Sequence, residues 1–351
     1  MNFYNMRNMG EEKMRVLMVY SNVICACTRK CCFELSEGLK RYCDIDVMYY
    51  KELNDETIKK YDVIIFQRLG TAALITQDEK CNIYNLIDRN KNNKKFIYFI
   101  DDLILESQGG MPKILTSKCD AAICSSKTLA SYLKKYNNNV YIIHTFGDID
   151  FWESIKGSIY NKFTMIWAST GGLGKSIIKG ILSKRNELGF EFQLIAIGKG
   201  ASEFNNIKNV ITYPILTEKR MMEIIKGSNI LLNPMNNNDE TKKIIKTVFT
   251  GESIDFLNSK SEIKYAIAGV AKTCLLTSPV ENYLKVIKNR ENGIIISDNI
   301  DDWIKEIKFV YYNSDVVKEI TQKAYENVKN NYTIDAVAKS FIHILEEIIK
   351  I

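Results

Sequence analysis

Apolar residues recur along this chain in two spacings. Short apolar runs rich in β-branched residues alternate with stretches in which apolar residues recur every three or four positions. The first spacing is typical of strands buried on both faces of a parallel sheet, and the second is typical of helices. The predicted strands are 15–21, 45–50, 62–67, 95–100, 121–125, 140–144, 163–169, 192–197, 210–213, 230–233 and 273–277. The predicted helices are 33–42, 78–90, 127–136, 177–188, 218–226 and 240–248.

The alternation pauses near residue 150 and restarts at Phe163. Strands that alternate with helices predict doubly wound α/β units, and 351 residues are enough for two of them. We therefore expect an α/β fold of two tandem Rossmann-like domains, 1–150 and 151–332, that face a cleft. A regular apolar stripe over 333–351 predicts a last helix that must pack on another part of the chain.

The charge balance allows an anionic ligand or a weak attraction to anionic lipid. The 48 basic and 42 acidic residues give a net charge of +6 that is spread along the chain, so it lacks the clustered basic footprint of a nucleic-acid binder. No apolar run approaches the ~18 residues that span a bilayer. The first residues also lack the apolar segment of a signal peptide. We expect a cytoplasmic protein, with peripheral contact at the inner face of the membrane allowed by its charge.

Nine cysteines are many for this length, and Cys25, Cys27, Cys31 and Cys32 lie close together. Their spacing matches neither the paired cysteines of zinc sites nor an iron–sulfur pattern. With only two histidines in the chain, we expect reduced and partly buried thiols rather than a metal centre.

The stretch 258–277 predicts a helix followed at once by a strand. Ser259 or Ser261 can cap this helix, which begins near Ile263. The first backbone N–H groups of a helix lack partners within it, and together with Lys260 and Lys264 they suit phosphate oxygens. The alternative is an ordinary capped helix with solvated lysines.

A glycine-rich turn, T-G-G-L-G-K-S, lies between a predicted strand and a predicted helix. Glycines let the backbone approach a phosphate closely. The nucleotide-binding Walker pattern requires a glycine at position 169, which is Ser169 here, so a nucleoside triphosphatase is disfavoured. The alternative is a tight turn without a ligand. The candidate ligand contacts are Gly171, Gly172, Gly174 and Lys175.

Three residues are candidates for acid–base chemistry, because Asp101 and Asp102 follow a predicted strand and His144 ends another. Asp101 and Asp102 can bind acceptor hydroxyls or help to remove a proton, or they can cap the next helix. His144 can transfer a proton, or it can hydrogen-bond the connection between the domains. Glu281 follows a later strand and can contact a sugar hydroxyl, or it is a solvated turn residue.

Several stretches resemble glycosyltransferases with the GT-B fold, particularly retaining enzymes of family 4 and bacterial relatives that build surface glycans. The individual motifs are loose, but their order and spacing are specific, and together they cover most of the chain. They are Y-D-V-I-I-F-Q-R at 61–68, K-K-F-I-Y-F-I-D-D-L at 94–103, C-S-S-K-T-L-A-S-Y-L at 124–133, K-S-E-I-K-Y at 260–265, E-N-G-I-I-I-S-D at 291–298 and N-N-Y-T-I-D-A-V-A at 330–338.

The resemblance implies transfer of a sugar from a nucleoside diphosphate sugar to a surface-glycan, lipid-linked or protein acceptor held between the domains. The donor would bind the second domain, with its diphosphate on the glycine-rich turn and on Lys260–Ile263, and its base near Tyr213–Ile215. The final helix would cross back onto the first domain. No metal cofactor is required in many relatives, since basic residues and helix ends offset the phosphate charge.

The chain departs from the family where two glutamates usually flank the phosphate-binding helix start. Those positions are Ser259 and Ile267 here. A ribose facing Ile267 would lose a charge-assisted hydrogen bond of about 1.5–3 kcal/mol. Either another acid such as Glu262 substitutes, or donor binding is weak or lost. The alternatives to a transferase are therefore a degenerate binding or assembly subunit with this fold, or an epimerase of the same fold.

Overall fold

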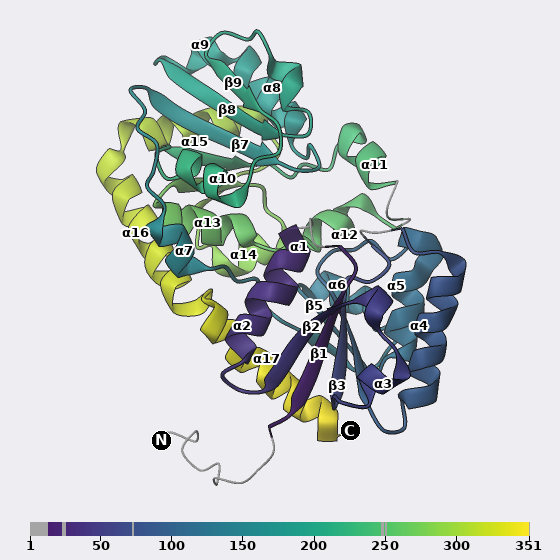
Figure 1. Ribbon diagram of the computed structural model, residues 1–351. Coiled ribbons are helices and arrows are strands. Elements are labelled where there is room, and N and C mark those ends of the chain that lie inside the picture. Colours follow the sequence, from purple (N-terminus) through teal and green to yellow (C-terminus); the bar gives the residue numbers. More distant parts are fainter. Residues whose placement is uncertain (1–12, 23–25, 72–73, 247–248, 250, 351) are drawn as a thin grey trace. The chain divides into compact units, whose positions relative to one another are not determined.

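The computed structural model describes residues 13–22, 26–71, 74–246, 249 and 251–350 (Figure 1). The chain divides into two compact units. Unit 1 contains the described residues up to Cys124, then 130–143, and the C-terminal residues from Ala338. Unit 2 contains 125–129 and 144–337.

Unit 1 is built on a six-stranded parallel sheet with the order β2-β1-β3-β4-β5-β6. Its central strands consist of consecutive apolar residues and are buried on both faces, as expected for parallel strands covered by helices. The strands are β1 Arg15–Tyr20, β2 Asp44–Tyr49, β3 Val63–Gln67, β4 Lys95–Ile100, β5 Ala121–Cys124 and β6 Val140–Ile142.

Helices cover both faces of the first sheet, with α2 and α17 on one side and α4 and α5 on the other in Figure 1. The last helix, α17, packs Phe341 against Phe99 of β4 with ring centroids 5.8 Å apart. The prediction that the final helix packs on the first domain is thus confirmed. The helices are α1 Ala26–Thr28, α2 Leu35–Leu39, α3 Asp55–Ile58, α4 Gln77–Asn90, α5 Ser107–Lys118, α6 Lys127–Leu133, which spans the boundary between the units, and α17 Ile334–Lys350.

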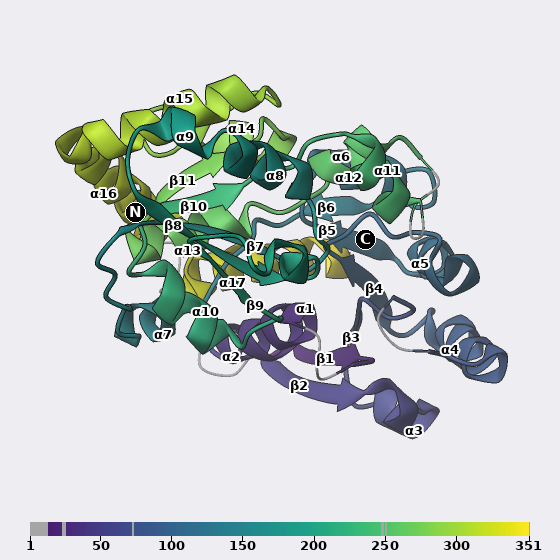
Figure 2. The same ribbon diagram turned by 90° about the horizontal axis from the view of Figure 1, so that it is seen from above.

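Unit 2 repeats this architecture with a second six-stranded parallel sheet of order β12-β11-β10-β7-β8-β9. Figure 2 shows α8, α9 and α15 on one face of this sheet, and α10 and α13 on the other. The strands are β7 Phe163–Ser169, β8 Phe192–Gly198, β9 Val210–Tyr213, β10 Ile230–Asn233, β11 Cys274–Thr277 and β12 Ile294–Ile295. The helices are α7 Ile149–Ser154, α8 Lys175–Ser183, α9 Arg185–Leu188, α10 Glu218–Ile225, α11 Asp239–Ile245, α12 Ser253–Asn258, α13 Ile263–Ala271, α14 Glu281–Val286, α15 Ile300–Tyr312 and α16 Ser314–Asn331.

The predicted α/β fold class is therefore confirmed. The differences concern the ends of several elements and helices that were not predicted, among them α5, α7, α12, α14, α15 and α16. The predicted helix 177–188 is divided at Lys184, and the predicted strand 140–144 ends at Ile142. Helix α5 was not predicted because Gln108, Gly109 and Gly110 have positive φ and interrupt its pattern. Part of the predicted helix 240–248 lies outside the described residues. Among the described helices, none combines the length and the apolar character needed to cross a bilayer.

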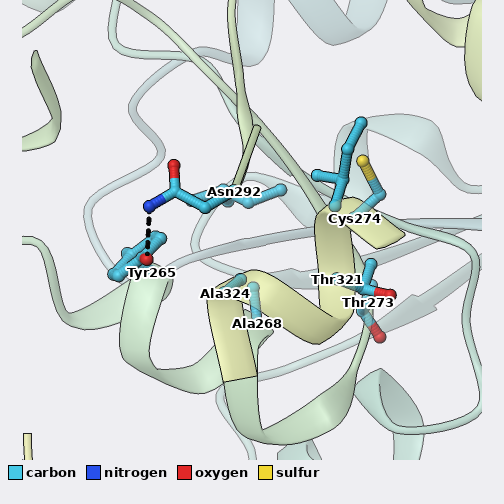
Figure 3. A pocket seen from close by; sticks show the side chains of 9 residues that line it. Tyr265, Ala268, Thr273, Cys274, Asn292, Thr321 and Ala324 are labelled. Carbon is cyan, nitrogen blue, oxygen red and sulfur yellow. Dashed lines mark hydrogen bonds between the residues drawn. The ribbon is translucent and has the colours of Figure 1, made fainter. Parts of the chain in front are cut away.

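Helix α13 is held close to α16 by small residues. Ala268 of α13 and Ala324 of α16 line one recess with Tyr265, whose hydroxyl accepts a hydrogen bond from Asn292 at 2.9 Å (Figure 3). A Cβ atom placed on Gly269 would lie 2.7 Å from Val328 Cγ2. The close approach of these helices therefore depends on glycine at position 269.

Gly269→Ala should destabilise the protein, although alanine has the higher helix propensity. The intrinsic gain is about 1 kcal/mol, whereas overpacking costs about 1–3 kcal/mol. We expect a lower free energy of unfolding in urea. Val328→Ala removes the nearest clash, so in a double-mutant cycle the two losses should sum to more than the loss of the double variant. A more stable Gly269→Ala protein would contradict this packing.

Candidate functional site

The glycine-rich turn connects β7 to α8 at the carboxyl edge of the second sheet. Gly172 and Gly174 have φ values of 77° and 79°, a region that favours glycine. A Cβ atom on Gly174 would lie 2.2 Å from the carbonyl oxygen of Pro234. Position 174 therefore requires glycine for both its conformation and its contact. No described side chain caps the start of α8 at this residue.

The start of α13 differs from the prediction, because neither Ser259 nor Ser261 caps it. Glu262 occupies the N-cap position, and its own side chain does not cap the helix. The Tyr283 side chain hydrogen-bonds the backbone of Lys264 in the first turn. Ser259 is buried, and its hydroxyl donates to the carbonyl of Phe256 at 2.8 Å. Ser259 is thus committed to the end of α12, a helix that the sequence did not predict. The carbonyl of Ser261 accepts from the Tyr283 hydroxyl at 3.4 Å.

Lys264 and Asn233 bring the glycine-rich turn and the start of α13 together. Lys264 Nζ donates to Asn233 Oδ1 at 2.9 Å, at the end of β10. The next residue, Pro234, contacts Gly174 of the turn. Asn233 is fixed in turn by its side-chain amide, which donates to Thr277 Oγ1 at 2.9 Å. Two helix starts and one lysine therefore lie at the carboxyl ends of neighbouring parallel strands, where α/β sheets bind their ligands.

The lysines near these helix starts differ in their surroundings. Burial lowers the pKa of Lys264 to about 8, so a small rise in pH removes its charge. Lys260 Nζ lies 4.1 Å from the centroid of the Phe256 ring. Ile263 is the first residue of α13. Of the predicted phosphate contacts around α13, Lys264 is the one that the structure connects to the glycine-rich turn.

Lys175 is already paired with acidic side chains. It forms ion pairs with Glu203 and with Glu240 of α11, the latter with Nζ–Oε1 at 2.5 Å. Burial alone would lower the pKa of Lys175, but these two partners raise it instead. Asn236 and Asn238 donate to Ser176 Oγ at 2.9 and 2.6 Å. The connection after β10 therefore contacts Ser176 at the end of the glycine-rich turn, and Glu240 beyond it pairs with Lys175, the predicted phosphate contact.

The remaining candidates of unit 2 lie near strands of its sheet. Tyr213 ends the edge strand β9, and Ile215 beyond it is 65% exposed. Glu281 begins α14, accepts a hydrogen bond from Thr128 and pairs with Lys285 at 3.0 Å. Burial raises the pKa of Glu281, but these two partners outweigh it and lower the pKa overall.

His144 lies two residues beyond β6, and its side chain is 71% exposed. Its Nδ1 atom is 3.8 Å from Oε1 of Glu262, whose side chain is only 2% exposed. The sequence marked both residues as candidates but gave no reason to place them together, because they belong to distant segments.

In unit 1, Asp101 and Asp102 pair with an arginine that the sequence analysis missed. Arg68 Nη1 donates to Asp101 Oδ1 at 2.6 Å and to Asp102 Oδ2 at 2.9 Å. It also lies 3.3 Å from Cys27 Sγ. Arg68 follows β3 with a φ of 48°, next to the end of β4, so adjacency of these strand ends was the available signal. The two carboxylates are therefore part of a buried ion-pair cluster.

The cysteines of the N-terminal cluster have separate surroundings. Cys25 lies outside the described residues, and no disulfide joins the cysteines that are described. Cys31 and Cys32 are buried, and burial raises the pKa of Cys32 to about 12, which makes it an unreactive thiol. Cys27, Asp101 and Asp102 form the one group of potential metal ligands found within the described part of the chain, with Arg68 beside all three.

Arg68→Met should destabilise unit 1, because it leaves two carboxylates without their counter-charge. Loss of one partner from a buried ion pair costs of order 3 kcal/mol. Urea unfolding of the single variant measures this loss. Adding Asp101→Asn and Asp102→Asn removes the uncompensated charges and should recover most of it, so a triple variant as unstable as Arg68→Met would contradict the role of Arg68.

The lowered pKa of Lys264 predicts a pH-dependent stability. Between about 8 and the ordinary lysine value of ~10.4, the unfolded chain binds more protons at this residue than the folded chain does. Wild type should therefore gain stability relative to Lys264→Met as pH rises through this window, by of order 1 kcal/mol. Urea unfolding of both proteins at pH 7.5 and pH 10 tests this, and a constant difference would show that Lys264 is not desolvated.

No family model matches this sequence, and no curated protein sequence matches it. Solved structures, in contrast, match nearly the whole chain. HepE from Anabaena in complex with UDP and glucose is 10% identical with a TM-score of 0.67, and the match covers 95% of this chain and 100% of that one. Sucrose-phosphate synthase from Thermosynechococcus elongatus is 9% identical with a TM-score of 0.65, over 96% of this chain and 100% of that one.

A glycosyltransferase from Rickettsia africae is 12% identical with a TM-score of 0.66, and the match covers 97% of this chain and 100% of that one. At identities this low, the structural matches establish the fold alone. The resemblance to GT-B glycosyltransferases is therefore confirmed in three dimensions, and this chain has the fold of two Rossmann-like domains that defines the group.

Proposed function

We propose that this protein is a glycosyltransferase that transfers a sugar from a nucleoside diphosphate sugar, with a UDP-sugar as the donor to test first. One observation carries the proposal: Lys264 hydrogen-bonds Asn233, and Gly174 lies against the next residue, Pro234. Two phosphate-compatible features from separate segments thus converge at one sheet edge. HepE, which has the same fold, has been solved in complex with UDP-glucose.

The charges at this edge suit a diphosphate. The N-cap residues of α8 and α13 are Gly174 and Glu262, and neither one satisfies the first backbone N–H groups of its helix with its own side chain. Those N–H groups and the positive end of each helix dipole attract anions. Lys264 adds a positive charge at neutral pH, since its pKa lies near 8. These groups would offset the diphosphate charge without a metal ion.

The same groups explain how the reaction would be promoted. Transfer breaks the bond between the sugar and the diphosphate and forms a bond from the sugar to an acceptor hydroxyl. Negative charge then grows on the departing diphosphate, and fixed positive groups lower the energy of that state. Lys175 would join them only after exchanging Glu203 or Glu240 for phosphate.

We assign the donor to unit 2 and the acceptor to unit 1. Asp101 and Asp102 would accept hydrogen bonds from acceptor hydroxyls while Arg68 balances their charge. Tyr213 and Ile215 would lie near the base, and Glu281 near a sugar hydroxyl. By resemblance, the reaction would be retaining, would use a surface-glycan, lipid-linked or protein acceptor, and would take place in the cytoplasm or at the inner face of the membrane.

A second candidate function is a non-catalytic subunit that binds a nucleotide-sugar or assembles with other proteins. Ser259 is committed to α12, and Ile267 is only 6% exposed within α13. Neither residue therefore replaces the glutamate that the family usually has there. A panel of UDP-sugars and GDP-sugars separates the candidates: measurable hydrolysis or transfer supports the enzyme, and nucleotide binding without turnover supports the subunit.

Lys264→Met should weaken UDP binding at pH 7 by at least about tenfold, equivalent to ~1.4 kcal/mol. The substitution removes the ammonium group that lies at the start of α13 and hydrogen-bonds Asn233, next to the glycine-rich turn. Isothermal titration calorimetry measures this affinity. Lys272→Met is the matched control, since Lys272 is exposed at the opposite end of the same helix and hydrogen-bonds Gln322 at 3.1 Å.

Two results would contradict the proposed donor site. Wild-type protein that binds neither UDP nor GDP would exclude a nucleoside diphosphate sugar as the ligand. Equal UDP affinity in Lys264→Met and Lys272→Met would place the diphosphate elsewhere.

A further inference from the structure

The pairing of His144 with Glu262 adds a charged group to the start of α13. Glu262 is the N-cap residue of this helix and lies two residues before Lys264. Its Oε1 atom is buried, and within the described part of the chain no donor hydrogen-bonds to it. The nearest cationic group is the His144 imidazole, with Nδ1 at 3.8 Å, an ion-pair distance longer than a hydrogen bond.

The other described neighbours of Glu262 include uncharged tyrosines, and Tyr332 hydrogen-bonds the Glu262 side chain. Tyr283 and Tyr332 are buried beside it, and their pKa values are raised first by burial and then by its negative charge. Lys285 is the other charged group that acts on His144, and it is paired with Glu281. A buried carboxylate is costly unless a positive charge balances it, so Glu262 favours the protonated form of His144.

We propose that His144 is a cationic member of the diphosphate site, held as an imidazolium by Glu262. This inference rests on the proposed function and deepens it, because it assigns a leaving-group contact that the glycine-rich turn and Lys264 do not supply. Glu262 acts through His144 and is therefore a positioning residue.

Charge balance is the physical reason. A carboxylate at the N-terminus of α13 would repel a diphosphate and cancel the attraction of Lys264. An imidazolium neutralises that carboxylate through Nδ1, while Nε2 remains as a second donor of a side chain that is 71% exposed. The nearby Glu262 carboxylate raises the pKa of His144, against the opposing effects of burial and Lys285. When pH rises above that pKa, the carboxylate is uncompensated and anion affinity should fall.

The chain is well suited to a direct test, because it contains only two histidines. Proton NMR titration of the imidazole C2–H signals measures both pKa values at once. His343 is the internal control: it lies in unit 1 and pairs with Glu347 at 3.3 Å. Glu262→Gln should lower the pKa of His144, with the His343 signal as the reference.

Ligand binding supplies the second arm of the test. Saturating UDP should raise the pKa of His144 in wild type, since an anion that prefers the protonated form must shift its titration, and uridine should not. In His144→Gln, UDP affinity should fall several-fold at pH 6 and should depend less on pH than in wild type, below the range in which Lys264 titrates.

Each outcome has a distinct meaning. UDP that binds without moving the His144 pKa overturns this inference and leaves the proposed function standing. Failure of UDP to bind wild type overturns both. An unchanged His144 pKa in folded Glu262→Gln overturns the pairing, and if that variant does not fold, the shift caused by UDP in wild type decides the inference alone.

Discussion

The hydrogen bond from Lys264 to Asn233 is the contact on which the proposed donor site depends. It places a partly buried ammonium group at the carboxyl end of β10, beside the helix start of α13. The residue after Asn233 abuts Gly174, so the same short segment positions the glycine-rich turn. Because burial already lowers the pKa of Lys264, this lysine lacks full compensation in the unliganded protein. A bound anion would supply that compensation, which links the energetics of the fold to ligand binding.

The pattern of apolar residues was sufficient to predict the fold class and most elements. The runs that form β4 and β10 have the predicted bounds because each is continuously apolar and ends at polar residues. Helix α12 was missed because it follows an Asn-rich segment and has no regular apolar spacing. That omission led to the wrong cap for α13, since Ser259, which ends α12, resembles an N-cap in the sequence.

The chemistry of the site was less predictable, since it depends on contacts between distant segments. The sequence identified Lys264, Gly174, His144 and Glu262 one by one, but not that Asn233 joins the first two or that the last two pair. It also left open whether Asp101 and Asp102 are a base or a cap. Arg68 adds a third role, because a buried guanidinium balances both charges. The register of parallel strands, which brings β3 and β4 to the same edge, decides that outcome.

Several charged side chains of the two units face partners of opposite charge. Lys175 pairs with two glutamates, Arg68 pairs with two aspartates, and Glu262 faces a histidine.

The most direct test of the central claim is a crystal structure of the protein soaked with UDP. The account predicts both phosphates within ~3 Å of Lys264 Nζ or of the backbone N–H groups at the starts of α8 and α13. A UDP molecule whose phosphates contact none of these groups would contradict it.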